Sequence, residues 1–291
     1  MATTVTARPT GPRRSDTRIK LLLYVIGGGG AALAFLVPLG FALFRSAQPN
    51  DVIMNKPTLA TFFDWTTDNF HRLLSDGGMA RPVLNSLLVS LSTAALTAVL
   101  ATLAGYGFAR FVFRGRGVLL SVVVLTMMVP FQAILTPLYL ELNTLGLTDS
   151  LLGLVLFYTT VNLPFGVIVM RNAFAAIPAE LEDSAHVDGA GTARLLLSVL
   201  RPLIAPGAAT VALYAFLASW TEFLGALTFL TDPDLFTLPV SLSNLQQGTY
   251  GQVDYGLLAA GAVLAMIPCV VLYVGLQRFY VAGLASGSVK G

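Results

Sequence analysis

The residues most able to do chemistry lie in one polar segment, 178–202, within an otherwise apolar chain. Its acidic and small residues, and the glycine after them, are Glu180, Glu182, Asp183, Ser184, Ala185, Asp188 and Gly189. Pro178 suits the first position of a helix, acids complement the positive N-terminal end of the helix dipole, and Gly189 suits its end. The segment therefore predicts a helix of about eleven residues, which is too short to cross a bilayer.

This short helix presents a face that suits docking. Wound at 3.6 residues per turn, it would place Leu181, Ser184, Ala185 and Asp188 together. Small side chains in the middle of that face would let another protein approach the backbone, while the charged residues fix its orientation. The alternative is an amphipathic surface helix that has no partner.

A second set of polar residues falls inside apolar stretches. Glu222 is the only charged residue in any of them, and a charge at the centre of a bilayer costs about 2.5–3.5 kcal/mol. We therefore expect Glu222 to face water, a solute or a partner. Tyr214 and Thr221 share a helical face with Glu222, and weaker candidates are Asn162 and Gln132. Two roles stay open for Glu222, which are lining a path for a hydroxylated solute and pairing with a partner subunit.

The remaining reactive residues form no catalytic or metal-binding set. Cys269 is the only cysteine, and both histidines, His71 and His186, lie outside the apolar stretches. No lysine follows a glycine, so no phosphate-binding loop is present and ATP hydrolysis would have to be supplied by another protein. A net charge of +2 without a basic cluster argues against nucleic acid. We expect no catalytic residue, no metal and no cofactor.

The elements that must position these residues are membrane spans. The chain is 55% hydrophobic and 11% charged, with a mean hydropathy of +0.76, which excludes a soluble enzyme. Six stretches reach the ~20 apolar residues that a helix needs to cross a bilayer. They are 21–44, 84–108, 118–140, 151–170, 203–230 and 256–276. They predict an all-α membrane protein, since six helices of a soluble bundle would need polar faces that these stretches lack.

The distribution of basic residues predicts the orientation. Most of them precede the first span, join spans two and three or four and five, or follow the sixth. Both termini are therefore expected in the cytoplasm. The first span is too long for the apolar part of a cleaved signal peptide. We expect a disordered cytoplasmic arm at 1–20, a six-helix transmembrane domain at 21–280 and a cytoplasmic tail at 281–291. An ion-coupled secondary transporter is the alternative, but it would want more intramembrane ionisable groups and an internal repeat.

Segment 178–202 resembles the EAA loop of ABC importer permeases, in which Glu-Ala-Ala, three residues, Gly, nine residues and Ile-x-Leu-Pro recur. Gly189 and Pro202 hold that spacing, whereas Asp183-Ser184-Ala185 replaces Glu-Ala-Ala. Arg201 replaces the Leu, which nothing in the sequence explains. Further strings are similar to the second permease subunit of carbohydrate importers of the maltose type: Asn85-Ser86-Leu87, Tyr106-Gly107-Phe108-Ala109-Arg110, and Trp220-Thr221-Glu222-Phe223.

The resemblance implies a type I ABC importer permease fold, with a cytoplasmic coupling helix between the fourth and fifth spans. It implies a bacterial cytoplasmic (inner) membrane location, in the lipid bilayer, with a sister permease subunit, two ATPase subunits and an extracytoplasmic solute-binding protein as partners. Closure of the ATPase subunits would push the coupling helix, and the tail, through Val289, Lys290 and Gly291, would reach between them. The implied solute is a sugar or a related hydroxylated molecule.

Overall fold

The computed structural model describes residues 14–50, 52, 61, 63–75, 78–247 and 253–287, and within them every regular element is helical. Five helical segments are long and apolar enough to cross a membrane. They are Leu23–Ser46 of α1 (Arg14–Ser46), α4 (Ala80–Arg110), α7 (Leu151–Ala175), Thr192–Trp220, and Tyr255–Gly275 of α13 (Tyr255–Gly287). The fourth of these joins α9 (Thr192–Arg194), the π-helical turn η1 (Leu195–Leu200) and α10 (Arg201–Trp220). The prediction of an all-α membrane protein is confirmed.

The third predicted span is not one straight helix. It consists of α5 (Arg116–Thr126) and α6 (Phe131–Thr144), which meet at a bend of 102°. Pro130 stands immediately before α6, and proline disfavours the helical conformation in the residue before it and removes a backbone donor. The pair counts as the sixth span only if both halves cross the membrane together.

The fifth predicted span also differs from the expectation of one helix over 203–230. Helix α10 ends at Trp220, and the short α11 (Leu224–Phe229) begins after a break of three residues. Thr221 and Glu222 therefore lie in the break and do not continue the helical face of Tyr214. The prediction that these three residues share one helical face is wrong.

Helices α4, α7 and α10 form the centre of the bundle through close backbone approach. A Cβ on Gly105 of α4 would lie 2.6 Å from Cβ of Met170 in α7. A Cβ on Gly166 of α7 would lie 2.8 Å from Cβ of Ala101 in α4 and 3.0 Å from Val211 of α10. Such small-residue contacts are how membrane helices pack when the surrounding lipid is as apolar as their side chains.

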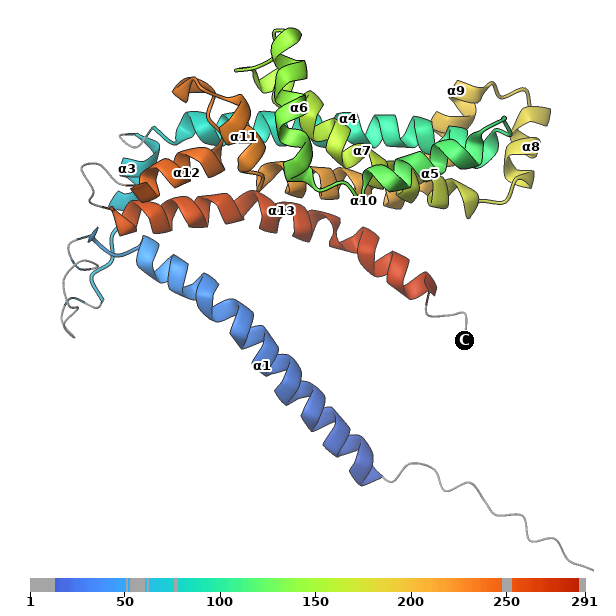
Figure 1. The fold of residues 1–291 in the computed structure, drawn as a ribbon. Coiled ribbons are helices and arrows are strands. Elements are labelled where there is room, and N and C mark those ends of the chain that lie inside the picture. Colours follow the sequence, from blue (N-terminus) through green and yellow to red (C-terminus); the bar gives the residue numbers. More distant parts are fainter. Residues whose placement is uncertain are drawn as a thin grey trace, which may run out of the picture.

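The bundle has two distinct ends, and α4 runs between them (Figure 1). One end, here called the α8 end, carries α8 (Glu180–Val187) and α9. The other, here called the α12 end, carries α3 (Asp68–Leu74), α11, the 3-10 turn η2 (Pro233–Leu235) and α12 (Leu238–Gln247). The candidate coupling residues and Glu222 therefore lie toward different ends.

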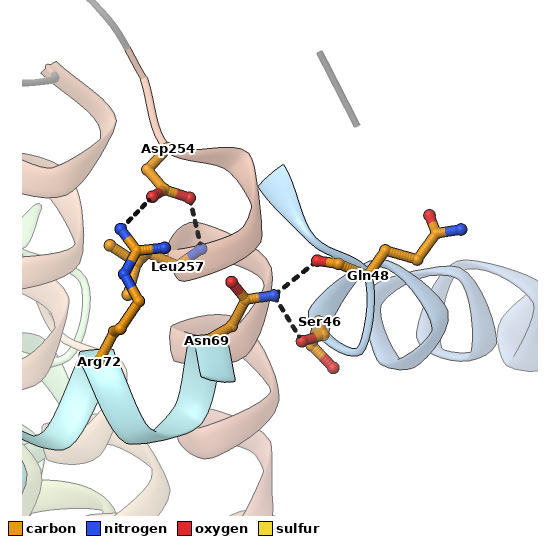
Figure 2. Close-up of polar contacts among 6 residues, drawn as sticks. All are labelled: Ser46, Gln48, Asn69, Arg72, Asp254 and Leu257. Atoms are coloured by element: carbon orange, nitrogen blue, oxygen red, sulfur yellow. Dashed lines mark hydrogen bonds and ion pairs between the residues drawn. The ribbon is translucent and has the colours of Figure 1, made fainter. Parts of the chain in front are cut away.

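Helix α1 is attached to the bundle mainly at the α12 end, and the rest of it diverges from α13 (Figure 1). The attachment is shown in Figure 2: the Asn69 amide donates to the carbonyls of Ser46 and Gln48 at 2.9 and 2.7 Å. Beside it, Arg72 pairs with Asp254 at 2.8 Å, and Asp254 accepts the backbone N–H of Leu257 at the start of α13. These contacts, here called the α3 clamp, join α1, α3 and α13.

Candidate coupling site and solute path

Helix α8 forms in the segment where the sequence predicts a short helix, but it is shorter than the eleven residues expected. It begins at Glu180, two residues after Pro178, and spans eight residues. Gly189 adopts φ +77°, a left-handed conformation that suits glycine, and the N–H of Ala190 bonds back to the carbonyl of Ala185 at 2.9 Å. The end of α8 is therefore set by the backbone of Gly189.

The inner face of α8 holds it against its own chain. Arg110, the last residue of α4, donates from Nε to Oε1 of Glu182 at 2.5 Å and from Nη2 to the carbonyl of Ile177 at 2.9 Å. The two charged side chains are only 16% and 10% exposed. Removing one partner of a buried ion pair typically costs ~3–5 kcal/mol, because the other charge is left without compensation. Glu182 thus fixes where α8 sits.

Ala185 lies on the same inner face, where it is buried and packs in a cluster with Tyr106 and Phe174. The expectation that Ala185 shares an outward face with Leu181, Ser184 and Asp188 is therefore wrong. An eight-residue helix resting on the bundle must turn one side inward, and Glu182 and Ala185 occupy that side.

The outer face of α8 is open and mixed in character. Val187 is 88% exposed and Leu181 39%, and Glu180, Asp183, Ser184 and Asp188 are exposed as well. Ser184 donates only to the carbonyl of Glu180, in its own helix. An exposed apolar side chain among carboxylates has the chemistry of a docking surface for another protein.

Glu222 has partners within its own chain. Its carboxylate accepts the Tyr158 hydroxyl of α7 at 2.5 Å and the backbone N–H of Gly225 at 2.9 Å. The N–H of Ala226 lies 3.4 Å away. Glu222 therefore supplies an acceptor for the free N–H groups that begin α11 and ties α11 to α7.

The other candidate solute-path residues are scattered. Asn162 is buried and donates to the carbonyl of Tyr158 at 2.7 Å, whereas Gln132 and Thr221 are exposed. Tyr214 is 44% exposed, and its ring lies against that of Phe165 at a tilt of 37°, with ring centroids 4.2 Å apart. It borders an open cleft of about 1050 Å³ in the angle between α5, α6 and α7. The structure does not bring all five candidates together.

Sequence reasoning missed two partners of the predicted residues, Arg110 and Tyr158. Arg110 stands in the Tyr106–Arg110 string, but a string carries no sign of a partner 72 residues away. Tyr158 is one of several aromatic residues in an apolar span and gave no signal. The tail residues Val289, Lys290 and Gly291 lie outside the described residues. Within the part of the chain that is described, no cluster of His, Cys, Asp or Glu could hold a metal ion.

Comparisons with known proteins give a consistent answer. Residues 97–286 match the family described as binding-protein-dependent transport system inner membrane component. The chain is 41% identical to "Putative ABC transporter permease protein ORF1" of Streptomyces antibioticus, over 82% of this chain and all of that one. It is 34% identical to the "Maltodextrin transport system permease protein MdxG" of Bacillus subtilis, over 78% of this chain and 81% of that one.

A solved structure has the same fold. A chain from the crystal structure of a bacterial ABC transporter involved in import of the acidic polysaccharide alginate superposes with a TM-score of 0.79. The alignment covers 93% of this chain and 99% of that one, at 23% sequence identity. Five spanning segments, or six if the bent pair of α5 and α6 is one span, the short polar helix α8, and these matches lead to one conclusion. The chain belongs to the binding-protein-dependent transport family and is a multi-pass inner membrane permease of an ABC importer, not an ion-coupled secondary transporter.

Proposed function

We propose that the chain forms, with a sister permease, the pathway by which a sugar or related hydroxylated solute crosses the membrane. The family supplies the reaction class, and the relative named for maltodextrin transport supplies the solute class. Carbohydrates present hydroxyl groups and apolar ring faces, which suit a cleft with hydroxyls and aromatic rings. Tyr214, Phe165 and Thr160 border such a cleft in this chain.

The observation that carries the coupling proposal is the outer face of α8. It is a helix too short to span the membrane, anchored from behind by Arg110 and Ala185, and it presents Asp183, Ser184, Val187 and Asp188 outward. When the ATPase subunits close, the subunit docked on this face would move α8 as a rigid unit. The contacts of Arg110 and Ala185 behind α8 would prevent it from shifting relative to its anchor. Glu180 and Gly189 shape the two ends of the surface, while Glu182 and Ala185 support it.

The complete importer then contains this chain, a sister permease, two ATPase subunits and an extracytoplasmic solute-binding protein. α8 faces the cytoplasm, as do both termini, in keeping with the basic residues near that end. The division into an arm at 1–20, a transmembrane domain at 21–280 and a tail at 281–291 belongs to the same proposal. So does a contact of Val289, Lys290 and Gly291 with the ATPase subunits.

Reconstitution of the complex tests this function. The chain is co-purified with the products of its neighbouring genes, placed in liposomes, and supplied with the solute-binding protein and labelled sugars, maltodextrin first. Uptake of a sugar that requires ATP and stops when the ATPase subunits are omitted is the expected result. Uptake driven by a proton or sodium gradient without ATP would contradict the proposal.

A further inference from the structure

The polar contacts that α4 makes with other elements lie at its two ends. At the α8 end, Arg110 binds the carboxylate of Glu182 and the carbonyl of Ile177. The residue thereby holds both the helix α8 and the chain that leads into it. The Arg110 guanidinium presents several donors in a fixed fork, so one side chain can make both contacts.

At the α12 end, the first turns of α4 hold the loop around η2. The Asn85 amide donates to the carbonyls of Asp234 and Phe236 at 2.9 and 3.1 Å. The Ser86 hydroxyl, which is buried, accepts the backbone N–H of Leu238 at 2.7 Å, where α12 begins. The segment from η2 to the start of α12 is therefore attached to α4 by hydrogen bonds between side chains of α4 and the backbone of that segment.

Between these ends α4 is packed but not locked by hydrogen bonds. Among the described residues, the buried hydroxyls of Ser90, Thr93 and Thr97 on α4, and of Thr159 on α7, have no hydrogen-bond partner. α4 is also the one described spanning segment without a proline in its interior or at a break; its Pro82 lies in the first turn. At 1.5 Å per residue its 31 residues span ~46 Å without a site that favours a kink.

We propose that α4 is the lever that carries the displacement of α8 to the α12 end, and that Arg110 is the positioning residue that joins α8 to it. The proposal rests on the proposed function, since it needs an ATPase that moves α8. When α8 moves, the ion pair between Glu182 and Arg110 moves α4 with it, because its surroundings offer little water to replace the contact. Asn85 and Ser86 deliver the movement to the loop that leads into α12.

The test measures coupling, as the number of sugar molecules taken up per ATP hydrolysed in reconstituted complexes. For Arg110→Gln we expect this ratio to fall about tenfold while the complex assembles and still hydrolyses ATP, because coupling between sites is typically worth factors of 5–150. Arg110→Lys keeps the charge but loses the forked set of guanidinium donors, so its ratio should lie between those of the wild type and Arg110→Gln. Arg114→Gln, an exposed arginine four residues away, is the matched control and should keep the wild-type ratio.

The opposite end of α4 provides a second, independent variant. Asn85→Ala should lower the same ratio, and the double variant Arg110→Gln/Asn85→Ala should be no worse than the lower single variant, because both break one path. If Arg110→Gln does not accumulate, Arg110→Lys and Asn85→Ala decide the matter. A wild-type ratio in both, or independent effects that multiply in the double variant, overturns the lever.

A purely structural role for Arg110 predicts something else, namely less inserted protein with an unchanged ratio, and that result also overturns the inference. Failure of the proposed function is distinguishable, since wild-type complexes would then show no ATP-dependent sugar uptake. Wild-type uptake with an unaffected ratio in Arg110→Gln would overturn only the lever.

Discussion

Glu182 and Asp183 are adjacent acids in one short helix, yet they meet different surroundings. Glu182 is buried against Arg110, whereas Asp183 is exposed. The sequence marks both as acids near a helix N-terminus, and it correctly places Gly189 where the helix must end. The direction in which each acid points depends on a contact made across 72 residues, which no local pattern contains.

Gly189 offers a sharp test at this scale. Gly189→Val would force a β-branched residue into φ +77°, at a cost of ~1–2 kcal/mol, although no atom lies within 4 Å of the added Cβ. We expect the protein to insert but sugar uptake and solute-stimulated ATP hydrolysis to fall at least ~10-fold, because the end of α8 is displaced. Gly78→Val, at φ +62° and equally open, places the same strain at the other end of the bundle and serves as control. Normal stimulated hydrolysis in Gly189→Val would rule out α8 as the coupling site.

Tyr158 and Glu222 allow support and solute binding to be separated. Tyr158→Phe removes the hydroxyl that Glu222 accepts at 2.5 Å, and a hydrogen bond to a charged group contributes ~1.5–3 kcal/mol. We expect a lower thermal midpoint of the purified complex and an unchanged apparent affinity for sugar. Tyr214→Phe, the same change at the cleft, should lower the apparent affinity for sugar and leave the thermal midpoint unchanged. A shifted solute affinity in Tyr158→Phe with unchanged stability would instead place the pair in the solute path.

At the scale of elements, the apolar stretches predicted where helices occur, but two of them are broken. Hydropathy shows whether a stretch is apolar over enough residues to cross the membrane. It does not show whether the helix bends or ends within that stretch. The 102° bend between α5 and α6 follows from the local chemistry at Pro130. The end of α10 could not be predicted this way, because the carboxylate of Glu222 and the hydroxyl of Tyr158 stabilise the start of α11 only once both helices are in place.

The order of the spans leads to a topology test. In a Cys269→Ala background, single cysteines replace the exposed residues Ser75 and Asn244 at the α12 end and Val112, 94% exposed, between α4 and α5. Cysteines at Ser75 and Asn244 should react with an impermeant thiol reagent in sealed cells, and one at Val112 only after the membrane is opened, because basic residues flank the inner connections. Labelling of the Val112 position in sealed cells would reverse the orientation of the whole bundle.

At the scale of the whole molecule, composition and the apolar stretches were enough to predict a membrane bundle. The spacing around Gly189, taken together with the six stretches and the further strings, predicted its family. The position of α1 was beyond prediction. Its spanning window has no buried residues, so its own pattern says nothing of the direction in which it leaves the bundle. That direction depends on the α3 clamp, in which Asn69, 1% exposed, bonds two carbonyls from the end of α1.

The clamp should therefore control the angle of α1. Asn69→Ala removes the two hydrogen bonds to the carbonyls of Ser46 and Gln48, and one such bond contributes ~0.5–1.5 kcal/mol. With spin labels on the exposed positions Phe35 of α1 and Tyr273 of α13, in a Cys269→Ala background, the distance distribution should be narrow in the parent and broad in Asn69→Ala. Arg72→Gln should broaden it less, because the Arg72–Asp254 pair is 36% and 23% exposed and water can partly replace it. Asn244→Ala, an exposed asparagine on α12, is the control, and a distribution that stays narrow in Asn69→Ala would show that contacts along α13 set the angle of α1.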